Sequence, residues 1–416
     1  MISPGSKGWI AKYLQLVDSG EISLELPSHP GIQNDAFLHH YLTRTGIVYG
    51  HPNELLFANE LNRKKWTSDE TLTVLLFEAL LFVYLQHNCE KKFDETAFLE
   101  SIELFYKKHR VQSLGAFLGY LFKESKAEKL ERILNKRCDV QRHLSSTKSW
   151  LSYFNNAFIY LDILLFDDFL EHHSKNTLDY QQLALLSLAI ITLSAYSDGS
   201  VEESEKALFE TFLLSADLDT EERELAKLRF KSGTSLNELD AELKGGWNVK
   251  RFLLDISALT VFCNHASADD ERTFLNELGD WLLLGESDVE QAIMLAQHFV
   301  LENQNNISYL KDAGSVENMM NNVSKRWIKI LGRNKDKLAV ELKQSKELVS
   351  LIRKSAGTEL TKEEKEKVKT QFMDIAKSMP ALAIFLLPGG ALLLPIVLKV
   401  IPNLVPSAFR ENELEE

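Results

Sequence analysis

Acidic residues gathered in two short stretches have the types and spacing that could bind a metal ion. Each stretch follows an apolar helical pattern and opens the next helix, and their first residues lie 71 positions apart. Carboxylate oxygens are preferred ligands of Ca²⁺ and Mg²⁺, yet acids at a helix start also cap it and favour its positive dipole end. A divalent-cation site and ordinary helix capping are therefore both open interpretations. The six residues are Asp198, Glu202, Glu205, Asp269, Asp270 and Glu271.

Outside these stretches, the sequence has no arrangement that predicts enzyme chemistry. Ser-His-Asp, Cys-His and phosphate-loop patterns are missing, so we predict that the protein is not an enzyme. The adjacent pairs His39-His40 and His172-His173 point about 100° apart on a helix, which makes neither pair a chelate by itself. We expect these residues to be solvated or capping histidines.

The composition favours helices throughout the chain. Hydrophobic residues make up 45% of the 416 residues, and 9 prolines and 19 glycines interrupt them. Such a chain can bury sizeable cores, and its long stretches without turn residues predict an all-α, multi-domain fold of helical bundles. Three cysteines without paired spacing are typical of reduced residues in a cytoplasm-facing protein. We therefore expect a bacterial protein with most of its chain in the cytoplasm.

Charge is divided unevenly along the chain. The net charge is −13, with −18 in residues 1–320 and +5 in residues 321–416. The acidic body argues against DNA as a partner. Residues 321–378 hold 15 basic and 8 acidic side chains, directly before an apolar stretch, where anionic lipid headgroups would attract them. A solvated face, partly neutralised by nearby glutamates, is the alternative. The basic residues expected to face lipid are Lys343, Lys346, Arg353, Lys354, Lys365, Lys367 and Lys369.

A charge-free stretch covers residues 380–398, PALAIFLLPGGALLLPIVL. At about 1.5 Å per helical residue it reaches roughly 28 Å, close to the hydrocarbon thickness of a bilayer. Pro388-Gly389-Gly390 within it predicts either a kinked transmembrane helix or a re-entrant segment. The lipid bilayer is the expected partner, and homo-oligomerisation would satisfy non-helical backbone at depth. The basic flank before the segment favours the cell inner membrane with the body on the cytoplasmic side.

The residues around this stretch resemble the Letm family of membrane proteins. Leu393-Leu394-Pro395, Pro402-Asn403 and Pro406-Ser407 follow the order of that family's proline-punctuated membrane segment, which a charged helix precedes. The resemblance implies membrane residence, and the family is linked to cation/proton exchange and to ribosome association at the membrane. The membrane-segment residues are Pro380, Pro388, Gly389, Gly390, Pro395, Lys399, Pro402 and Pro406.

Two departures from the family pattern bear on the implied activities. The family usually carries an acid between the two prolines, where this chain has Gly389, Gly390 and Ala391. An intramembrane carboxylate is the natural handle for a proton or cation, so its replacement argues against ion exchange. The sequence continues seven residues past Phe409, and we expect the family's large domain beyond the membrane segment, which is associated with ribosome contact, to be missing.

A second resemblance covers residues 176–305. They resemble the tellurite-resistance protein B (TerB-like) domain, an all-helical module with two related halves. Asp198 and Gly199 match the acidic turn of its first half, and Asp269 matches that of the second, where Asp270 replaces the usual glycine. The resemblance implies that the two acidic stretches occupy corresponding places in the two halves.

Capping signals mark several helix starts. A Thr or Asp followed three residues later by Glu has the spacing of a capping box. The first such helix is apolar but is interrupted by Glu78, which predicts a buried core helix rather than a membrane span. The pairs are Thr67 with Glu70, Asp219 with Glu222 and Thr361 with Glu364, and the same spacing with Ser in the first position joins Ser200 to Glu203 and Ser287 to Glu290.

These patterns predict six segments and one favoured function. We expect a cytosolic binding or stress-response module tethered to the inner membrane by a Letm-like segment. A component of a cation/proton (K⁺ or Ca²⁺) exchange system and a ribosome-binding protein are the alternatives. The segments are an N-terminal helical domain of unknown type (1–175), a TerB-like domain (176–305), an Asn-rich linker (306–324), basic amphipathic helices (325–378), the Letm-like membrane segment (379–409) and an acidic tail (410–416).

Overall fold

Every regular element in the described part of the chain is helical, which confirms the all-α fold class. The chain divides into two units, Met1–Ala292 and Ile293–Glu416. The computed structural model describes residues 2–26, 34–89, 91–109, 125–138, 154, 156–172, 178–197, 199, 201, 203–239, 245–262, 268–302, 325, 328, 331–355, 358, 360–377, 379 and 401–402.

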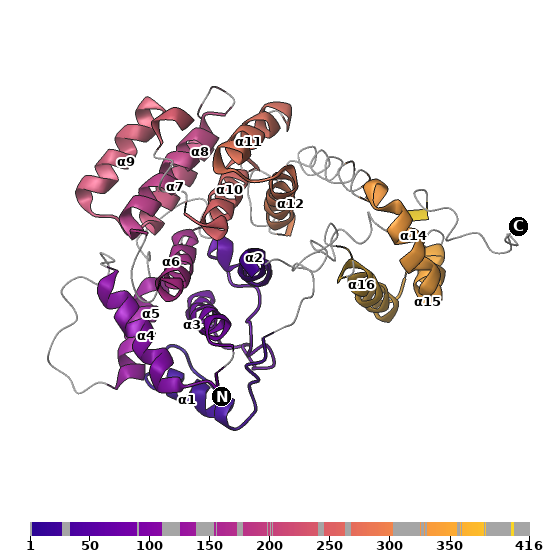
Figure 1. Ribbon diagram of the computed structural model, residues 1–416, viewed down its shortest axis with the longest axis horizontal. Helices are drawn as coiled ribbons and strands as arrows, with labels where there is room; N and C mark the ends of the chain where they lie inside the picture. The colour runs from indigo at the N-terminus through magenta and orange to yellow at the C-terminus, as the bar shows by residue number, and fades with distance from the viewer. Residues whose placement is uncertain are drawn as a thin grey trace, which may run out of the picture. The chain divides into compact units, whose positions relative to one another are not determined.

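The first unit contains the helices α1 to α11 and the start of α12, coloured from indigo to red in Figure 1. Three short 3-10 helices, η1 (Ile47–Tyr49), η4 (Ala157–Ile159) and η5 (Leu236–Glu238), lie among them. The α-helices are α1 (Trp9–Asp18), α2 (Asn34–Thr45), α3 (Ser68–His87), α4 (Glu95–Lys108), α5 (Lys126–Cys138), α6 (Tyr160–Glu171), α7 (Tyr180–Ala195), α8 (Glu203–Ser215), α9 (Thr220–Ser232), α10 (Trp247–Phe262), α11 (Ala268–Leu282) and α12 (Glu286–Glu302).

Two apolar helices, α3 and α10, organise the first unit. Helix α3 packs against α5 and α6, and α10 packs against α7, α11 and α2. Helices α8 and α9 pack on α7 from the side away from the chain's N-terminus (Figure 1). The boundary predicted near residue 175 falls inside this unit, since α6 also packs on α7.

Helix α3 is the buried core helix that its sequence predicts. Its residues 72–84 are all buried, including Glu78 with no exposed surface. The Glu78 carboxylate accepts hydrogen bonds from Tyr13 Oη at 2.7 Å and from the backbone N–H groups of Leu56, Phe57 and Ala58. Burial raises the pKa of Glu78, and these hydrogen bonds to the charged form act against that rise. The one acid in the buried part of this helix, residues 72–84, therefore supports the loop at residues 56–58.

Three of the predicted capping boxes, at Thr67, Asp219 and Thr361, are confirmed. Ser200 lies outside the described residues, and Ser287 lies within α12, which begins at Glu286, so it does not cap that helix. Thr67 Oγ1 accepts from the Glu70 N–H at 3.1 Å, and the Glu70 side chain accepts from the Thr67 N–H at 2.7 Å. The same reciprocal bonds join Asp219 to Glu222, both at 2.9 Å. They join Thr361 to Glu364 at 3.0 and 3.2 Å. Each box satisfies two backbone donors that a helix start leaves unpaired.

The second unit contains three consecutive basic helices, drawn in orange and gold in Figure 1. They are α14 (Lys335–Gln344), α15 (Lys346–Ser355) and α16 (Lys362–Lys377), and each packs against the other two. Their apolar faces bury one another, as amphipathic helices of this length require for stability. The buried side chains are Leu338, Leu342, Leu348, Val349, Ile352, Val368, Phe372 and Ile375.

Candidate functional site

Of the six acidic residues proposed as metal ligands, the structure describes one side chain. Glu205 lies in the first turn of α8 and is 3% exposed. Asp198 and Glu202 lie outside the described residues, as do the side chains of Asp269, Asp270 and Glu271. Within the part of the chain that the structure describes, no three His, Cys, Asp or Glu side chains are grouped to hold a metal ion. The divalent-cation site stays a prediction.

The membrane segment lies almost wholly outside the described ranges. Of its eight assigned residues, Pro402 is described, beside the buried Ile401 and in helical conformation. Among the helices that the structure describes, none combines the length and the apolar character needed to cross a bilayer.

The seven basic residues expected to face lipid all lie on α14, α15 and α16, and we call them the basic surface. Lys354, Lys367 and Lys369 are among those that form ion pairs. Lys354 Nζ lies 2.6 Å from Glu364 Oε1 and Lys367 Nζ lies 3.0 Å from Glu347 Oε1, which links α15 to α16 twice. Lys369 faces Glu366 on its own helix at 3.7 Å.

These pairs divide the basic surface into two parts. Hydrogen bonds from Lys367 and Gln371 lower the pKa of the Glu347 carboxyl, so that it stays ionised beside its partners. Exposed pairs of this kind are worth about 0–1 kcal/mol each, and they neutralise the lysines that they hold. Lys343 and Lys346, where α14 meets α15, are also exposed but take no part in these pairs. The solvated, self-neutralised interpretation therefore fits the α15–α16 side of the surface better than the α14–α15 corner.

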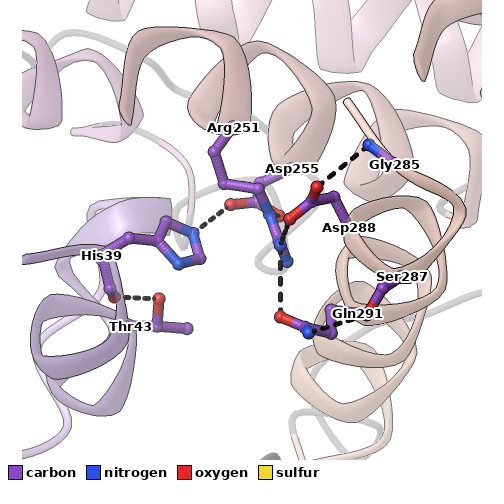
Figure 2. A network of polar contacts seen from close by, with 8 residues as sticks. All are labelled: His39, Thr43, Arg251, Asp255, Gly285, Ser287, Asp288 and Gln291. Atoms are coloured by element: carbon purple, nitrogen blue, oxygen red, sulfur yellow. Dashed lines mark hydrogen bonds and ion pairs between the residues drawn. The ribbon is translucent and has the colours of Figure 1, made fainter. Parts of the chain in front are cut away.

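Figure 2 shows a buried polar network that joins α2 to α10 and α12 in the first unit. His39 Nε2 lies 2.6 Å from Asp255 Oδ2, and Arg251 Nε donates to Asp255 Oδ1 at 3.0 Å. Arg251 Nη1 donates to Asp288 Oδ1 at 3.4 Å and to Gln291 Oε1 at 3.3 Å. The side chains of His39, Arg251 and Asp255 are 6%, 0% and 0% exposed. The expectation that His39 is solvated or caps a helix is therefore wrong.

Electrostatics assign the protonation states in this network. Burial lowers the pKa of His39, against the opposing effect of Asp255. Burial alone would raise the pKa of Asp255, but Arg251 and His39 lower it overall. With Asp255 ionised, His39 Nε2–H is the donor in this contact. Trp247 covers one side, with its ring centre 5.6 Å from that of His39.

A second buried arginine joins α5 to α6 and to the turn between α8 and α9. Arg137 makes a bidentate pair with Asp162, at 2.8 and 2.7 Å, and Nη1 donates to Asp217 Oδ2 at 3.0 Å. Tyr106 Oη donates to Asp162 as well, at 2.9 Å. Asp217 has φ 49°, a left-handed conformation that costs energy for a residue with a Cβ. Its ion pair helps to hold the turn in this conformation.

An open cavity of about 450 Å³ lies between α5 and the residues that precede α1. Its acids are already engaged in the fold. Glu131 accepts from the backbone N–H groups of Gly8 and Ile10, both at 2.8 Å, and Glu128 pairs with Lys7 at 3.2 Å. The two acids that line the cavity therefore hold the N-terminus of α1 and the residues before it against α5.

The sequence carries a signal for the buried networks that motif searches overlook. Arg251 and Asp255 stand four residues apart within the apolar pattern RFLLDIS, so both lie on one face of α10. Asp162 likewise interrupts an apolar run. A charged residue inside such a pattern must be buried with a partner. The partners His39 and Arg137 come from distant helices, and no local pattern identifies them.

Comparison with known proteins bears on the C-terminal region. The family model described as LETM1-like, RBD matches residues 360–416, a range that includes α16 and its capping box. The mitochondrial LETM1 domain-containing protein YLH47 of Saccharomyces cerevisiae is 40% identical over 83 residues, which are 19% of this chain and 18% of that protein. The mitochondrial LETM1 domain-containing protein mdm28 of Schizosaccharomyces pombe is 37% identical over 79 residues, 19% of this chain and 16% of that protein.

These matches confirm the Letm-like assignment of the C-terminal region. The chain spans less than a fifth of the length of either yeast relative. No solved structure matches the chain significantly. The C-terminal region is thus a LETM1-like segment, and the TerB-like character of residues 176–305 stays a prediction.

Replacing Arg137 by Met should destabilise the first unit strongly. The substitution leaves Asp162 and Asp217 buried without a cation, and breaking a buried pair in this way costs about 3–5 kcal/mol. Urea unfolding followed by circular dichroism measures the loss. Lys136→Met is the matched control, because Lys136 is the exposed neighbour on the same helix, and it should change the unfolding free energy by less than about 0.5 kcal/mol. Equal midpoints for the two variants would contradict the assigned role of Arg137.

Proposed function

We propose that this chain is a membrane-anchored Letm-like protein whose helical body is a binding module tethered to an inner membrane. The observation that carries the proposal is the LETM1-like match over residues 360–416, which contains the charge-free stretch 380–398 directly after the basic helix α16. A stretch of that length and composition is long enough to enter or cross a bilayer.

The basic surface supports a contact with anionic lipid next to this anchor. A lysine near an anionic leaflet contributes about 1 kcal/mol to membrane binding. Lys354, Lys367 and Lys369 are held by neighbouring glutamates, so their contribution is reduced. We therefore assign the main lipid contact to Lys343 and Lys346, which are exposed where α14 meets α15.

The distribution of charge supports a cytoplasmic body. Basic residues next to a membrane segment favour the cytoplasmic side, and residues 321–378 carry a net charge of +7 before the apolar stretch. We propose that the acidic body lies on that side of the membrane, where its partners would be.

Charges placed inside the apolar stretch should release the protein from membranes. An Asp near the middle of a transmembrane helix costs about 2.5–3.5 kcal/mol, so the double variant Leu386→Asp/Leu392→Asp should lose most of its resistance to alkaline carbonate extraction. Leu228→Asp, at an exposed position of α9, adds an acid to the body and should behave as wild type. Extraction of the wild-type chain by carbonate would sink the proposal of an integral anchor.

Neutralising the α14–α15 corner should weaken binding to anionic vesicles. We expect Lys343→Gln/Lys346→Gln to weaken binding to phosphatidylserine-containing vesicles by roughly 2 kcal/mol, or about thirtyfold in affinity. Flotation at several vesicle concentrations measures this affinity. The measurement is best made in the Leu386→Asp/Leu392→Asp background, where the anchor no longer masks the surface contact. Lys64→Gln/Lys65→Gln removes two exposed lysines of the body as a control. Flotation that is indifferent to phosphatidylserine would exclude the lipid contact while leaving the anchor untouched.

Ribosome association is the second candidate function. The observation that favours it is the match to the LETM1-like, RBD model, whose range includes the exposed lysines of α16. Binding to ribosomal RNA through lysines should weaken as salt rises, because it releases counterions. We expect the detergent-solubilised chain to co-sediment with ribosomes at low salt and to lose this at high salt, with Lys365→Glu/Lys369→Glu binding less. Co-sedimentation that ignores both salt and these substitutions would contradict this candidate.

A further inference from the structure

Helix α9 carries an exposed apolar face. Its inward side is fixed in the first unit, because Phe230 stacks on Phe209 of α8 with ring centres 4.0 Å apart and its carbonyl oxygen accepts from Tyr196 Oη at 3.0 Å. Its outward side presents Leu225 and Leu228, which are 49% and 64% exposed. Figure 1 shows α9 at the outer edge of this unit. The two leucines stand three residues apart, so they are neighbours on one face of the helix.

This pair of leucines differs from other exposed apolar side chains in the described part of the chain. A single exposed leucine is ordinary on a protein surface. Leu104 of α4, Leu283 after α11 and Val340 of α14 each stand alone on their element. Helix α9 instead presents two such side chains together. Neighbouring leucines on one helix face form an apolar strip that a partner helix can cover.

The charges along α9 indicate what that partner is. Residues 221–224 contain three glutamates and one arginine, a net charge of −2, whereas residues 227–231 contain two lysines and one arginine, a net charge of +3. Two parallel copies of the helix would place acid against acid and base against base. Two antiparallel copies place the acidic half of each against the basic half of the other, which is favourable for both halves. The helix is therefore complementary to a second copy of itself.

We propose that the outward face of α9 is a self-association surface, through which two copies of this chain pair by an antiparallel α9–α9 contact. A two-fold axis close to Leu228 brings the Leu228 side chains of the two copies together, with Leu225 beside them. The same axis sets Glu224 of each copy opposite Lys231 of the other, so this charge pair forms twice. Glu224 contacts Lys227 of its own helix at 3.1 Å, but its side chain is 67% exposed and can reach the second copy.

The size of this contact predicts a weak, reversible dimer. A contact made by one helix from each copy falls at the small end of specific interfaces, below about 1,200 Å². We therefore expect a dissociation constant of micromolar order. The surface belongs to the helical body, so the dimer does not depend on the proposed membrane anchor, and the anchor's resistance to extraction does not depend on the dimer.

Sedimentation velocity of the detergent-solubilised full chain, over a range of concentrations, tests the apolar part of the surface. We expect a monomer–dimer equilibrium. Leu225→Ser/Leu228→Ser should raise its dissociation constant by at least about tenfold, because each substitution removes apolar contact area from both copies. Leu104→Ser is the matched control, since Leu104 is an exposed leucine of α4, and it should leave the constant unchanged. Circular dichroism should show wild-type helix content and melting for both variants, because the positions are exposed.

Charge exchange tests the antiparallel arrangement. Glu224→Lys sets two lysines against each other across the two-fold axis, and Lys231→Glu sets two glutamates against each other. Each variant should therefore self-associate more weakly than the wild type, by up to about tenfold. A mixture of the two variants restores both pairs of opposite charges in the mixed dimer. Sedimentation of this mixture should show dimer at concentrations where either variant alone is monomeric.

Three results would overturn the proposal. One is a wild-type chain that stays monomeric up to about 100 μM, well above a micromolar dissociation constant; the face would then fit a different protein. Another is the same dissociation constant for Leu225→Ser/Leu228→Ser as for the wild type, which would place self-association elsewhere, for instance in the membrane segment. The third is a mixture of the two charge variants that associates no better than either variant alone.

Discussion

A buried arginine must find an opposite charge within the fold, because its guanidinium stays protonated, and two arginines impose this constraint on the first unit. Arg137 and Arg251 have side chains that are 1% and 0% exposed. Arg137 pairs with Asp162 of α6 and Asp217 of the α8–α9 turn, and Arg251 pairs with Asp255 of its own helix and Asp288 of α12. The cost of leaving such a charge unpaired exceeds that of losing most single apolar contacts. Arg137 thereby links α5, α6 and the α8–α9 turn, and the Arg251–Asp255 pair links α10 to α2 through His39.

Local features of the fold were predictable because interactions between residues that are close in the sequence determine them. Thr67, Asp219 and Thr361 each form the capping box that their spacing with a following glutamate predicts. Glu78 lies in a buried helix, as an acid in an otherwise apolar pattern of that length indicates. The sequence does not, however, say which loop the Glu78 carboxylate supports, because that depends on tertiary packing.

Long-range pairs were not predictable, and the histidines illustrate why. His39 belongs to a sequence pair that suggests a solvated surface, yet its partner Asp255 lies 216 residues further along the chain. No residue close to His39 in the sequence predicts its contact with Asp255. The basic surface was predictable in part. Its location on amphipathic helices follows from the sequence pattern. Which of its lysines pair with a glutamate depends on how α15 packs against α16.

The two buried networks join residues on both sides of position 175, where the sequence predicts a domain boundary. Arg137 and His39 precede residue 175, and their partners Asp217 and Asp255 follow it. A fragment that begins at residue 176 would keep the acids and lose the cation and the imidazole that face them. The two halves of this body are therefore poor modules for exchange between proteins. Recombination near residue 175 would separate Arg137 from Asp217 and His39 from Asp255, and each product would carry polar groups in its interior without these partners.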